Sequence, residues 1–248
     1  MTASFARELL GWIASKGRYS LVPNCADTDS EQSVKIAGEM LNYLGVPAGV
    51  PTDVTKNPGP ALESMVEADL GKRLIQLRPD REWEVKRGRV VTKFLQYRHL
   101  DEVHALVRRD PALAVTIGGD YLIRPDVTVG IVGPDGGLPF LHAAISCKWT
   151  IRSDRVQNIR HEFNQLIRHR RGRLPHLVTV TAEPLPSRLQ AIARGTGEVD
   201  AVYHIAYDAL AAAVESVGNE NQKAAWYECV QQGRVLSYER LVPTLVTW

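Results

Sequence analysis

The chain has 248 residues, of which 44% are hydrophobic and 23% charged, and its formal net charge is +2. These values fit a globular protein with one sizeable core. They argue against a membrane protein, because no apolar run approaches the roughly 18 residues that a spanning helix needs. The cysteines Cys25, Cys147 and Cys229 lack metal-ligand spacing and leave an odd one over. We therefore expect reduced thiols and a cytoplasmic protein with no membrane partner.

The N-terminal part, about residues 1–110, is predicted to be mainly helical, because apolar residues recur at helical spacing in several windows. The segment 22–32 is polar, and the segment 45–60 is rich in proline and glycine, so both predict loops. The expected elements are helices at 4–16 and 30–45, a helix beginning near Pro60, a strand at 83–87 and a helix at 94–109.

The predicted elements change from mainly helices to strands and helices in a predicted core at about 115–210. Two β-rich runs, 121–132 and 138–150, flank a Gly-Pro-Asp-Gly-Gly turn and predict paired strands. Further elements then alternate: helix 154–170, strand 176–183, helix 187–194, strand 201–207 and helix 206–217. This order predicts an α/β fold with a mixed central sheet flanked by helices. We expect residues 1–248 to form a single domain.

Basic residues are concentrated between Lys148 and Arg173. This segment has eight Lys and Arg residues and two acids, a local charge of +6, so the rest of the chain carries −4. A focused positive segment is typical of a surface that binds a polyanion. The alternative is a helix whose charged face is merely solvated.

Four residues around the predicted pair of strands could carry chemistry together. Asp126 lies on the first strand, and Ser146 and Lys148 share one face near the end of the second. Glu162 follows on the next helix, beside its apolar stripe, and can face the sheet. An aspartate followed by a short Ser-x-Lys is the pattern of PD-(D/E)xK nucleases. So short a match often arises by chance. The alternatives are that Asp126 is a turn residue and that Lys148 is an ordinary lysine at the edge of a strand.

Phosphodiester hydrolysis needs side chains of these kinds. Carboxylates such as Asp126 and Glu162 can hold one or two Mg²⁺ ions that bridge the scissile phosphate. A lysine such as Lys148 can orient or help deprotonate the attacking water and neutralise charge on the phosphate. The pattern is therefore that of a metal-dependent nuclease.

A second cluster follows the predicted catalytic strand, where Arg152, Asp154 and Arg155 lie at the start of a helix. Arginine can donate two hydrogen bonds to guanine O6 and N7, and aspartate can accept one from cytosine N4. The cluster favours recognition of G·C base pairs in the major groove. The alternative is a capped surface helix with an Arg–Asp pair.

Two long segments closely resemble the NgoMIV-type restriction endonucleases, a CCGG-recognising group of type II enzymes in the PD-(D/E)xK superfamily: HAAISCKWTIRSDRVQNIRHE and RRGRLPHLVTVTAEPLPSRLQAIARGTGEVDAVYH. The resemblance runs almost without gaps over residues 138–210, and it is traceable through 60–66 and 120–129. It departs from the family in two places. The segment between the two catalytic strands is shorter, and the loop 22–32 diverges.

The resemblance implies a restriction-endonuclease-like core and assigns a set of catalytic residues. These are Asp126, Ser146, Lys148, Glu162 and Glu63, with Glu67, one helical turn away, as the alternative to Glu63. The implied metal ligands are the carboxylates of Asp126, Glu162 and Glu63 and the backbone carbonyl of Cys147, whose thiol we expect in the core. Together they would hold two Mg²⁺ ions per active site.

The resemblance also implies which residues recognise DNA and where it is cut. The family's inner base-reading positions fall on Arg152, Asp154 and Arg155, and its outer ones on Arg188 and, in the diverging loop, Asp27. The implied site is a palindrome with a CCGG core, GCCGGC, cut to leave 5′-phosphates and a four-base 5′ overhang. Such an enzyme works in restriction–modification defence beside a DNA methyltransferase, with which we expect no stable complex.

A palindromic site calls for at least a homodimer on double-stranded DNA. Enzymes of the family pair two dimers, so we expect a homotetramer. The candidate surfaces are the loop 45–60 and the C-terminal segment with Trp226, Tyr227 and Trp248. Ordinary core packing is the alternative for each of these aromatic residues.

Two other functions fit part of the pattern. A structure-specific nuclease, such as a junction resolvase, would use the same catalytic core but needs no base-reading cluster. A DNA-binding protein without catalysis has no reason to keep a charged pocket that repels phosphate when metal is absent. Cleavage of plasmid DNA in Mg²⁺ and in EDTA, with sequencing of the ends, discriminates among the three.

Overall fold

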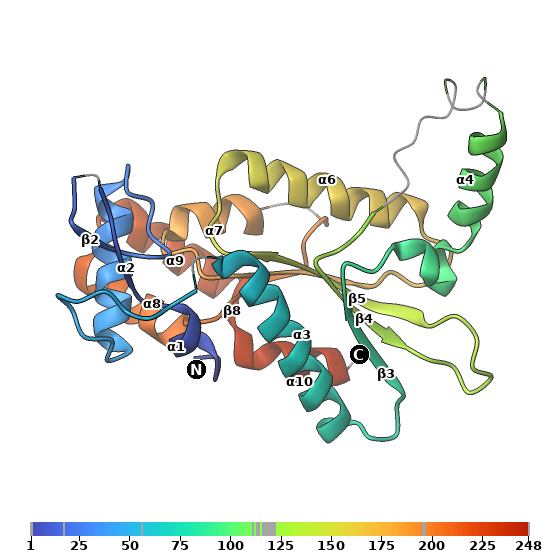
Figure 1. Ribbon diagram of the computed structural model, residues 1–248, viewed down its shortest axis with the longest axis horizontal. Helices are drawn as coiled ribbons and strands as arrows, with labels where there is room; N and C mark the ends of the chain where they lie inside the picture. The colour runs from blue at the N-terminus through green and yellow to red at the C-terminus, as the bar shows by residue number, and fades with distance from the viewer. Residues whose placement is uncertain are drawn as a thin grey trace.

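The computed structural model describes residues 2–16, 18–55, 57–110, 112, 115, 123–194 and 197–247, except the side chains of 153–155. Within these ranges a six-stranded mixed sheet in the order β3-β4-β5-β6-β7-β8 occupies the centre of the molecule (Figure 1). Its strands are β3 Trp83–Arg87, β4 Val127–Ile131, β5 Phe140–Lys148, β6 His176–Thr181, β7 Ala201–His204 and β8 Val235–Ser237. The predicted α/β fold with a mixed sheet flanked by helices is confirmed.

The sheet changes its mode of pairing at β5. Strands β3, β4 and β5 are antiparallel neighbours, whereas β5, β6, β7 and β8 run parallel. The interior of β5 is buried throughout, as expected for a central strand covered on both faces. The register pairs Val127 with Ile145 and Lys148 with Thr181, so the start of β4 and the end of β5 meet at one edge of the sheet.

Helices cover both faces of the sheet: α3 and α10 lie on one side and α6 on the other (Figure 1). Helix α3 has proline in its first turn and buries Leu62, Val66, Leu70 and Leu74 at four-residue spacing, as the sequence predicts. The helices are α1 Ala6–Leu9, α2 Glu31–Tyr43, α3 Pro58–Leu77, α4 His99–Arg109, α6 Ser153–His169, α7 Pro186–Ala193, α8 Tyr207–Val217, α9 Glu220–Gln231 and α10 Leu241–Thr247, with short 3-10 turns at Val91–Lys93, Leu95–Tyr97 and Tyr238–Arg240. In the described part of the chain, no helix has the length and apolarity that crossing a membrane requires.

The prediction of one helix over residues 4–16 is wrong. Helix α1 ends at Leu9, and the chain then forms β1 Trp12–Ala14, which pairs antiparallel with β2 Leu21–Pro23. The cause is a contact distant in sequence. A Cβ atom at Gly11 would lie 2.8 Å from the side chains of Thr52 and Val54, and the Thr52 N–H donates to the Trp12 carbonyl at 2.8 Å. Pairing with this loop therefore overrides the local helical spacing.

Most other predicted elements are present with shifted ends. The helix expected at 94–109 begins at His99, after a 3-10 turn, and β4, the first strand of the predicted pair, begins at Val127. The start of its predicted run, 121–122, lies outside the described residues. Strands β3 and β8 extend the sheet beyond the range 115–210 on both sides, and α9, β8 and α10 have no counterpart in the prediction.

Candidate active site

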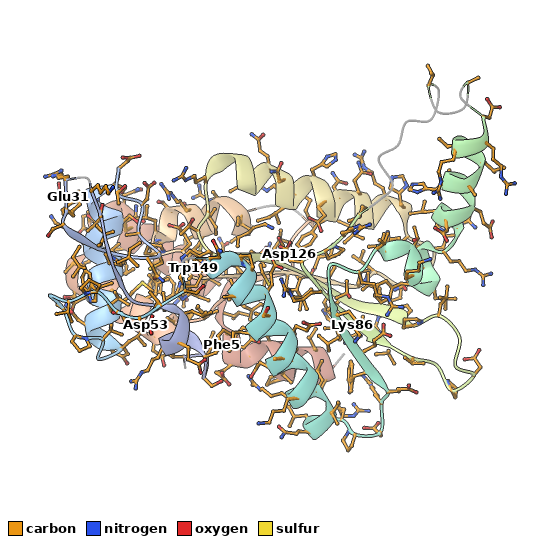
Figure 2. The ribbon with its side chains drawn as sticks, viewed as in Figure 1. Phe5, Glu31, Asp53, Lys86, Asp126 and Trp149 are labelled. Atoms are coloured by element: carbon orange, nitrogen blue, oxygen red, sulfur yellow. The ribbon has the colours of Figure 1, made fainter. Side chains whose placement is uncertain are left out.

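Three predicted residues and one backbone amide form a hydrogen-bonded cluster where β4 begins and β5 ends. Asp126 directly precedes β4 and lies near the centre of the molecule (Figure 2). The Lys148 Nζ and the Cys147 backbone N–H each donate to Asp126 Oδ2 at 2.7 Å, and the Ser146 hydroxyl donates to the same oxygen at 3.3 Å. The predicted pair of strands therefore brings these groups together and holds the Asp126 carboxylate.

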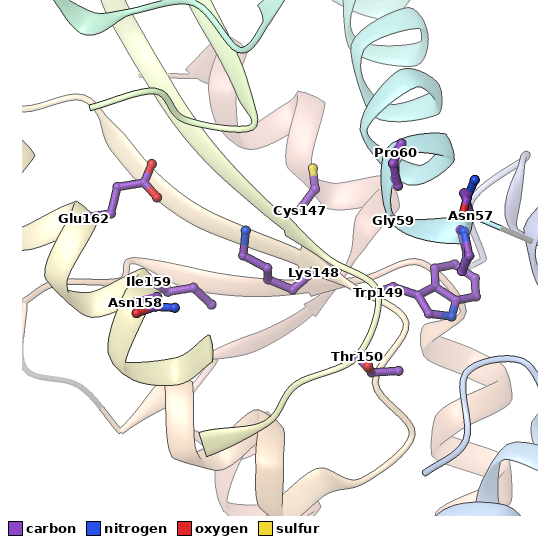
Figure 3. A pocket seen from close by; sticks show the side chains of 11 residues that line it. Asn57, Gly59, Pro60, Cys147, Lys148, Trp149, Thr150, Asn158, Ile159 and Glu162 are labelled. Atoms are coloured by element: carbon purple, nitrogen blue, oxygen red, sulfur yellow. The ribbon is translucent and has the colours of Figure 1, made fainter. Parts of the chain in front are cut away.

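Glu162 faces this cluster from α6. In Figure 3 its carboxylate and the Lys148 ammonium point into the same pocket, a cavity of about 600 Å³. Glu162 Oε1 is buried and has no hydrogen-bond partner among the described residues. Burial and, secondarily, the charge of Asp126 raise the pKa of Glu162 to about 7, against the opposing effect of Lys148. The pocket thus contains a carboxylate oxygen whose hydrogen-bonding capacity is unused.

The rest of the pocket wall comes from the start of α3 and from the turn after β5. Its other lining residues are Asn57, Pro58, Gly59, Pro60, Cys147, Trp149, Thr150, Asn158 and Ile159. The indole N–H of Trp149 donates to the Asn24 carbonyl at 3.0 Å, which ties the turn after β5 to the loop after β2. With a volume of about 600 Å³, the pocket could hold a phosphate group beside Lys148.

The donor set of the pocket fits a hard divalent cation. Mg²⁺ takes oxygen ligands, keeps several waters and binds proteins through one or two carboxylates, which Asp126 and Glu162 could supply. Across the described ranges, no three His, Cys, Asp or Glu side chains converge on a common point. Further ligands would therefore come from the backbone, water or phosphate. The unpartnered Glu162 Oε1 is the observation that supports the fit.

The thiol of Cys147 is part of the core, as expected. Alternation along β5 puts it on the opposite face from Ser146 and Lys148, and the residue is 4% exposed. Burial raises the pKa of Cys147 well above its usual value, and the charges of Asp126 and Glu63 add to this effect. The thiol is therefore protonated and a poor nucleophile, while its backbone carbonyl remains the proposed metal ligand.

Glu63 is held outside the hydrogen-bonded cluster. Its Oε2 accepts from Arg87 Nη2 at 2.8 Å and from Arg87 Nε at 3.3 Å, while Glu67 Oε1 accepts from the Arg87 backbone N–H at 3.2 Å. Both candidate glutamates on α3 thus contact the end of β3. Glu63 remains close enough for its charge to act on Cys147. To bind a metal ion as predicted, it would have to share its carboxylate with Arg87.

A second cavity, of about 470 Å³, brings together three of the predicted base-reading residues. Asp27, from the loop between β2 and α2, forms an ion pair with Arg188 on α7. Both residues and Arg152 line this cavity. The hydrogen bond from Arg188 holds the pKa of Asp27 below its usual value, and the charge of Arg152 contributes in the same direction. Asp27 therefore shares one polar site with two arginines that are distant from it in sequence, Arg188 being 161 positions away.

The predictions for Asp154 and Arg155 concern side chains outside the described part of the structure. Their backbone lies in the first turn of α6, which begins at Ser153 directly after Arg152. This position agrees with the predicted start of a helix after the second of the paired strands.

Sequence reasoning missed Glu183, which lies beside the second cavity. Its carboxylate is fully buried and accepts from the backbone N–H groups of Ile151 at 2.7 Å and Leu185 at 3.0 Å. Arg188 Nη1 lies 3.8 Å from Glu183 Oε2. The available signal was an acidic residue at the end of a predicted strand, 176–183, that is otherwise rich in apolar and β-branched residues.

The family described as NgoMIV restriction enzyme matches the chain over residues 5–133 and 131–241. The chain is 36% identical to the type II restriction enzyme NgoMIV of Neisseria gonorrhoeae over 265 aligned positions, which cover 93% of this chain and 92% of that enzyme. Two solved structures are similar at low TM-scores. A complex of the restriction endonuclease PspGI with substrate DNA has a TM-score of 0.41 and 10% identity, covering 90% of this chain and 83% of that one. The type IIF restriction endonuclease Bse634I with cognate DNA has a TM-score of 0.40 and 12% identity, covering 85% and 97%.

Proposed function

Because this chain belongs to the NgoMIV family of type II restriction endonucleases, we propose that it cleaves double-stranded DNA at the palindrome GCCGGC. Cleavage leaves 5′-phosphates and a four-base 5′ overhang, and it serves restriction–modification defence in the cytoplasm beside a separate DNA methyltransferase. The observation that carries the catalytic part is the Asp126–Lys148 cluster facing Glu162, whose buried Oε1 has no partner among the described residues.

A type II restriction endonuclease uses a divalent metal ion, and we propose Mg²⁺, two ions per active site, for this chain. Asp126, Glu162, Glu63 and the Cys147 carbonyl would hold the ions. When bound, they stabilise negative charge on the attacking and leaving oxygens of the scissile phosphate. Two observations support this proposal. All of these ligands offer the oxygen atoms that Mg²⁺ prefers, and the buried Glu162 Oε1 has no hydrogen-bond partner among the described residues.

The protein groups around Asp126 have separate roles in the proposal. The Cys147 N–H and the Ser146 hydroxyl fix the orientation of the Asp126 carboxylate. Lys148 Nζ lies in the same cluster and points into the pocket shared with Glu162. From there its ammonium can orient the attacking water and neutralise charge on the phosphate.

Base recognition is assigned to the polar cavity and the start of α6. Arg152, Asp154 and Arg155 would read the inner CCGG bases, with arginines on guanine O6 and N7 and aspartate on cytosine N4. Arg188 and Asp27 would read the outer base pair. The shared cavity of Asp27, Arg152 and Arg188 supports this grouping. Because Arg188 and Asp27 are paired with each other, reading the outer pair requires each to exchange this bond for one to a base.

Incubation of plasmid DNA with the protein in Mg²⁺ and in EDTA, followed by sequencing of the ends, tests the proposal. We expect cuts within GCCGGC in Mg²⁺ and none in EDTA. Cuts at branched DNA regardless of sequence would indicate a structure-specific nuclease. Binding without cleavage in Mg²⁺ would indicate a DNA-binding protein. Equal cleavage of plasmid that lacks CCGG would overturn the assigned specificity.

We further propose that the enzyme is a homotetramer, in which each protomer cuts one strand and two dimers hold two DNA sites. Candidate surfaces are the loop 45–60 and α9, where Val50 and Tyr227 are 59% and 67% exposed. Trp226 instead packs against Tyr207, with ring centroids 5.0 Å apart, and Trp248 lies outside the described residues. We expect faster cutting of two-site than of one-site plasmid. A dimer mass in light scattering with equal rates on both plasmids would leave only the dimer.

A further inference from the structure

Glu183 occupies an unusual position for an acidic residue. It lies two residues beyond the end of β6, and none of its surface is exposed. Fully buried carboxylates are rare unless they are paired, because removal from water costs several kcal/mol. The partners of Glu183 therefore indicate which role of this residue offsets the cost of its burial.

The two carboxylate oxygens join two separate chain segments. Oε2 accepts from the Ile151 N–H at 2.7 Å, and Oε1 accepts from the Leu185 N–H at 3.0 Å. Ile151 directly precedes Arg152, and Leu185 is the N-cap residue of α7, which carries Arg188 in its first turn. The same carboxylate thus fixes the backbone beside both arginines of the polar cavity.

Glu183 also contacts one of these arginines directly. Arg188 Nη1 lies 3.8 Å from Glu183 Oε2, while the other terminal nitrogen, Nη2, bonds Asp27. The guanidinium is therefore held between a buried carboxylate and a half-buried one. Such a pair of contacts restricts the rotamers of a long side chain before any base is present.

The backbone of Glu183 is fastened to the sheet. Its carbonyl accepts from His204 Nε2 at 3.2 Å, and its N–H donates to Thr181 Oγ1 at 3.1 Å. The Ala206 N–H donates to His204 Nδ1 at 3.1 Å, so Nε2 is the nitrogen that carries the proton. The carboxylate is therefore anchored on β6 and β7 and does not move with the loops that it holds.

We propose that Glu183 is a positioning residue for DNA recognition, which holds the segments of Arg152 and Arg188 in one geometry and thereby sets the enzyme's discrimination between sequences. This inference rests on the proposed function. The catalytic cluster is separate, since the hydrogen bonds at Asp126 come from Ser146, Cys147 and Lys148. Loss of Glu183 should therefore weaken discrimination more than the rate of cleavage at saturating cognate DNA.

The test compares Glu183→Gln with Glu228→Gln. Glutamine keeps the shape of Glu183 but loses the charge and one of the two acceptors. Glu228 is the matched control, because it accepts from Arg194 at the other end of α7, at 2.9 and 3.1 Å, away from the polar cavity. Dissociation constants are measured in Ca²⁺ for the GCCGGC duplex and for duplexes with one base pair changed. We expect E183Q to lose discrimination about tenfold or more and E228Q to retain it.

A second readout uses the unsubstituted enzyme and a property that a merely structural role would not affect. Burial raises the pKa of Glu183 to about 7, opposed by its backbone hydrogen bonds and Arg188. The other titratable groups facing it are Asp27, Cys25 and His204. Ionised Glu183 attracts Arg188, so wild-type discrimination should increase as pH rises through about 7. In E183Q the profile should be flat.

The possible outcomes separate this inference from the proposed function. If wild type does not distinguish GCCGGC from altered duplexes, the proposed function fails and the inference with it. If wild type discriminates and folded E183Q discriminates equally, only the inference is overturned. If E183Q does not fold, the pH profile of Glu162→Gln decides, because this variant lacks the other acid whose pKa is raised to about 7: a flat profile overturns the inference, and a rising one supports it.

Discussion

Glu162 and Glu183 are both acids whose pKa is raised to about 7 by burial, yet they differ in what surrounds them. Both oxygens of Glu183 accept backbone N–H groups, and an arginine lies beside them. Glu162 Oε1, in contrast, is buried without a hydrogen-bond partner in the described part of the molecule. The first carboxylate is satisfied within the fold, and the second is not.

This difference shows which property of a buried acid indicates a ligand. An unsatisfied buried polar atom costs about 1–3 kcal/mol, and most such atoms in native proteins are paired. Glu162 therefore points to a partner absent from the polypeptide, for which a divalent cation is suited. Glu183 has its partners within the chain, and its proposed role is to hold the segments of Arg152 and Arg188 in one geometry. Burial and a raised pKa alone would have assigned both residues the same role.

The largest expected effect is at Lys148, beside the unsatisfied acid. Lys148→Ala removes the ammonium that bonds Asp126 and faces Glu162, so cleavage should fall by at least about 10²–10³-fold. Binding of cognate DNA in Ca²⁺ should be spared. Lys35→Ala is the control, since Lys35 pairs with Glu31 on the exposed surface of α2. Near wild-type cleavage by K148A would show that the cluster is not the catalytic site.

The pH dependence of stability provides a second test of the comparison. A carboxyl pKa raised on folding, from 4.5 to about 7, favours the folded state at low pH. That contribution is fully present below pH 4.5 and is lost as pH rises from there through about 7. Metal-free Glu162→Gln should therefore be more stable than wild type above this pH, by up to about 3 kcal/mol in denaturant unfolding.

Glu183→Gln should gain less, because its amide leaves one backbone donor without an acceptor, at a cost of about 1–3 kcal/mol. The measurement is the free energy of unfolding of both variants and wild type in EDTA, below and above the raised pKa. An equal or larger gain for E183Q would contradict the distinction between the satisfied and the unsatisfied acid.

The smallest expected effect is at Ser146, whose hydroxyl makes the longest of the three bonds to Asp126 Oδ2, at 3.3 Å. Ser146→Ala removes one hydrogen bond of about 0.5–1.5 kcal/mol, so the cleavage rate should fall about two- to tenfold. Thr179→Val is a matched control, because Thr179 pairs with Ser146 across β5 and β6 and its buried hydroxyl has no partner among the described residues. A loss as large as that of K148A would contradict a supporting role for Ser146.

The convergence of Asp126, Ser146 and Lys148 could be predicted from the sequence because its geometry follows from local rules. Alternation along one strand places Ser146 and Lys148 on the same face, and antiparallel pairing with β4 brings them to Asp126. Glu162 follows from the helical spacing of the next element. Each step needs only neighbouring elements, and the register of a buried strand is strongly specified.

What the sequence could not predict depends on contacts between distant segments. Residues 4–16 have helical spacing, but β1 forms because Gly11 and Trp12 pack against Thr52, about 40 positions away. Glu183 is the last residue of the predicted strand 176–183, and its partners Ile151 and His204 are 32 and 21 positions distant. The ion pair of Asp27 with Arg188 spans 161 positions. Periodicity carries no information on such pairings.

The central claim is that Glu162, with Asp126, completes its coordination with a divalent cation, and DNA binding measured with and without Ca²⁺ tests it most directly. In EDTA the two carboxylates repel the scissile phosphate, so Ca²⁺ should tighten binding of the cognate duplex to wild type. Glu183→Gln should show the same tightening. Glu162→Gln should bind more tightly than wild type in EDTA and respond little to Ca²⁺. If Ca²⁺ tightened binding to E162Q as much as to wild type, Glu162 would not be a metal ligand.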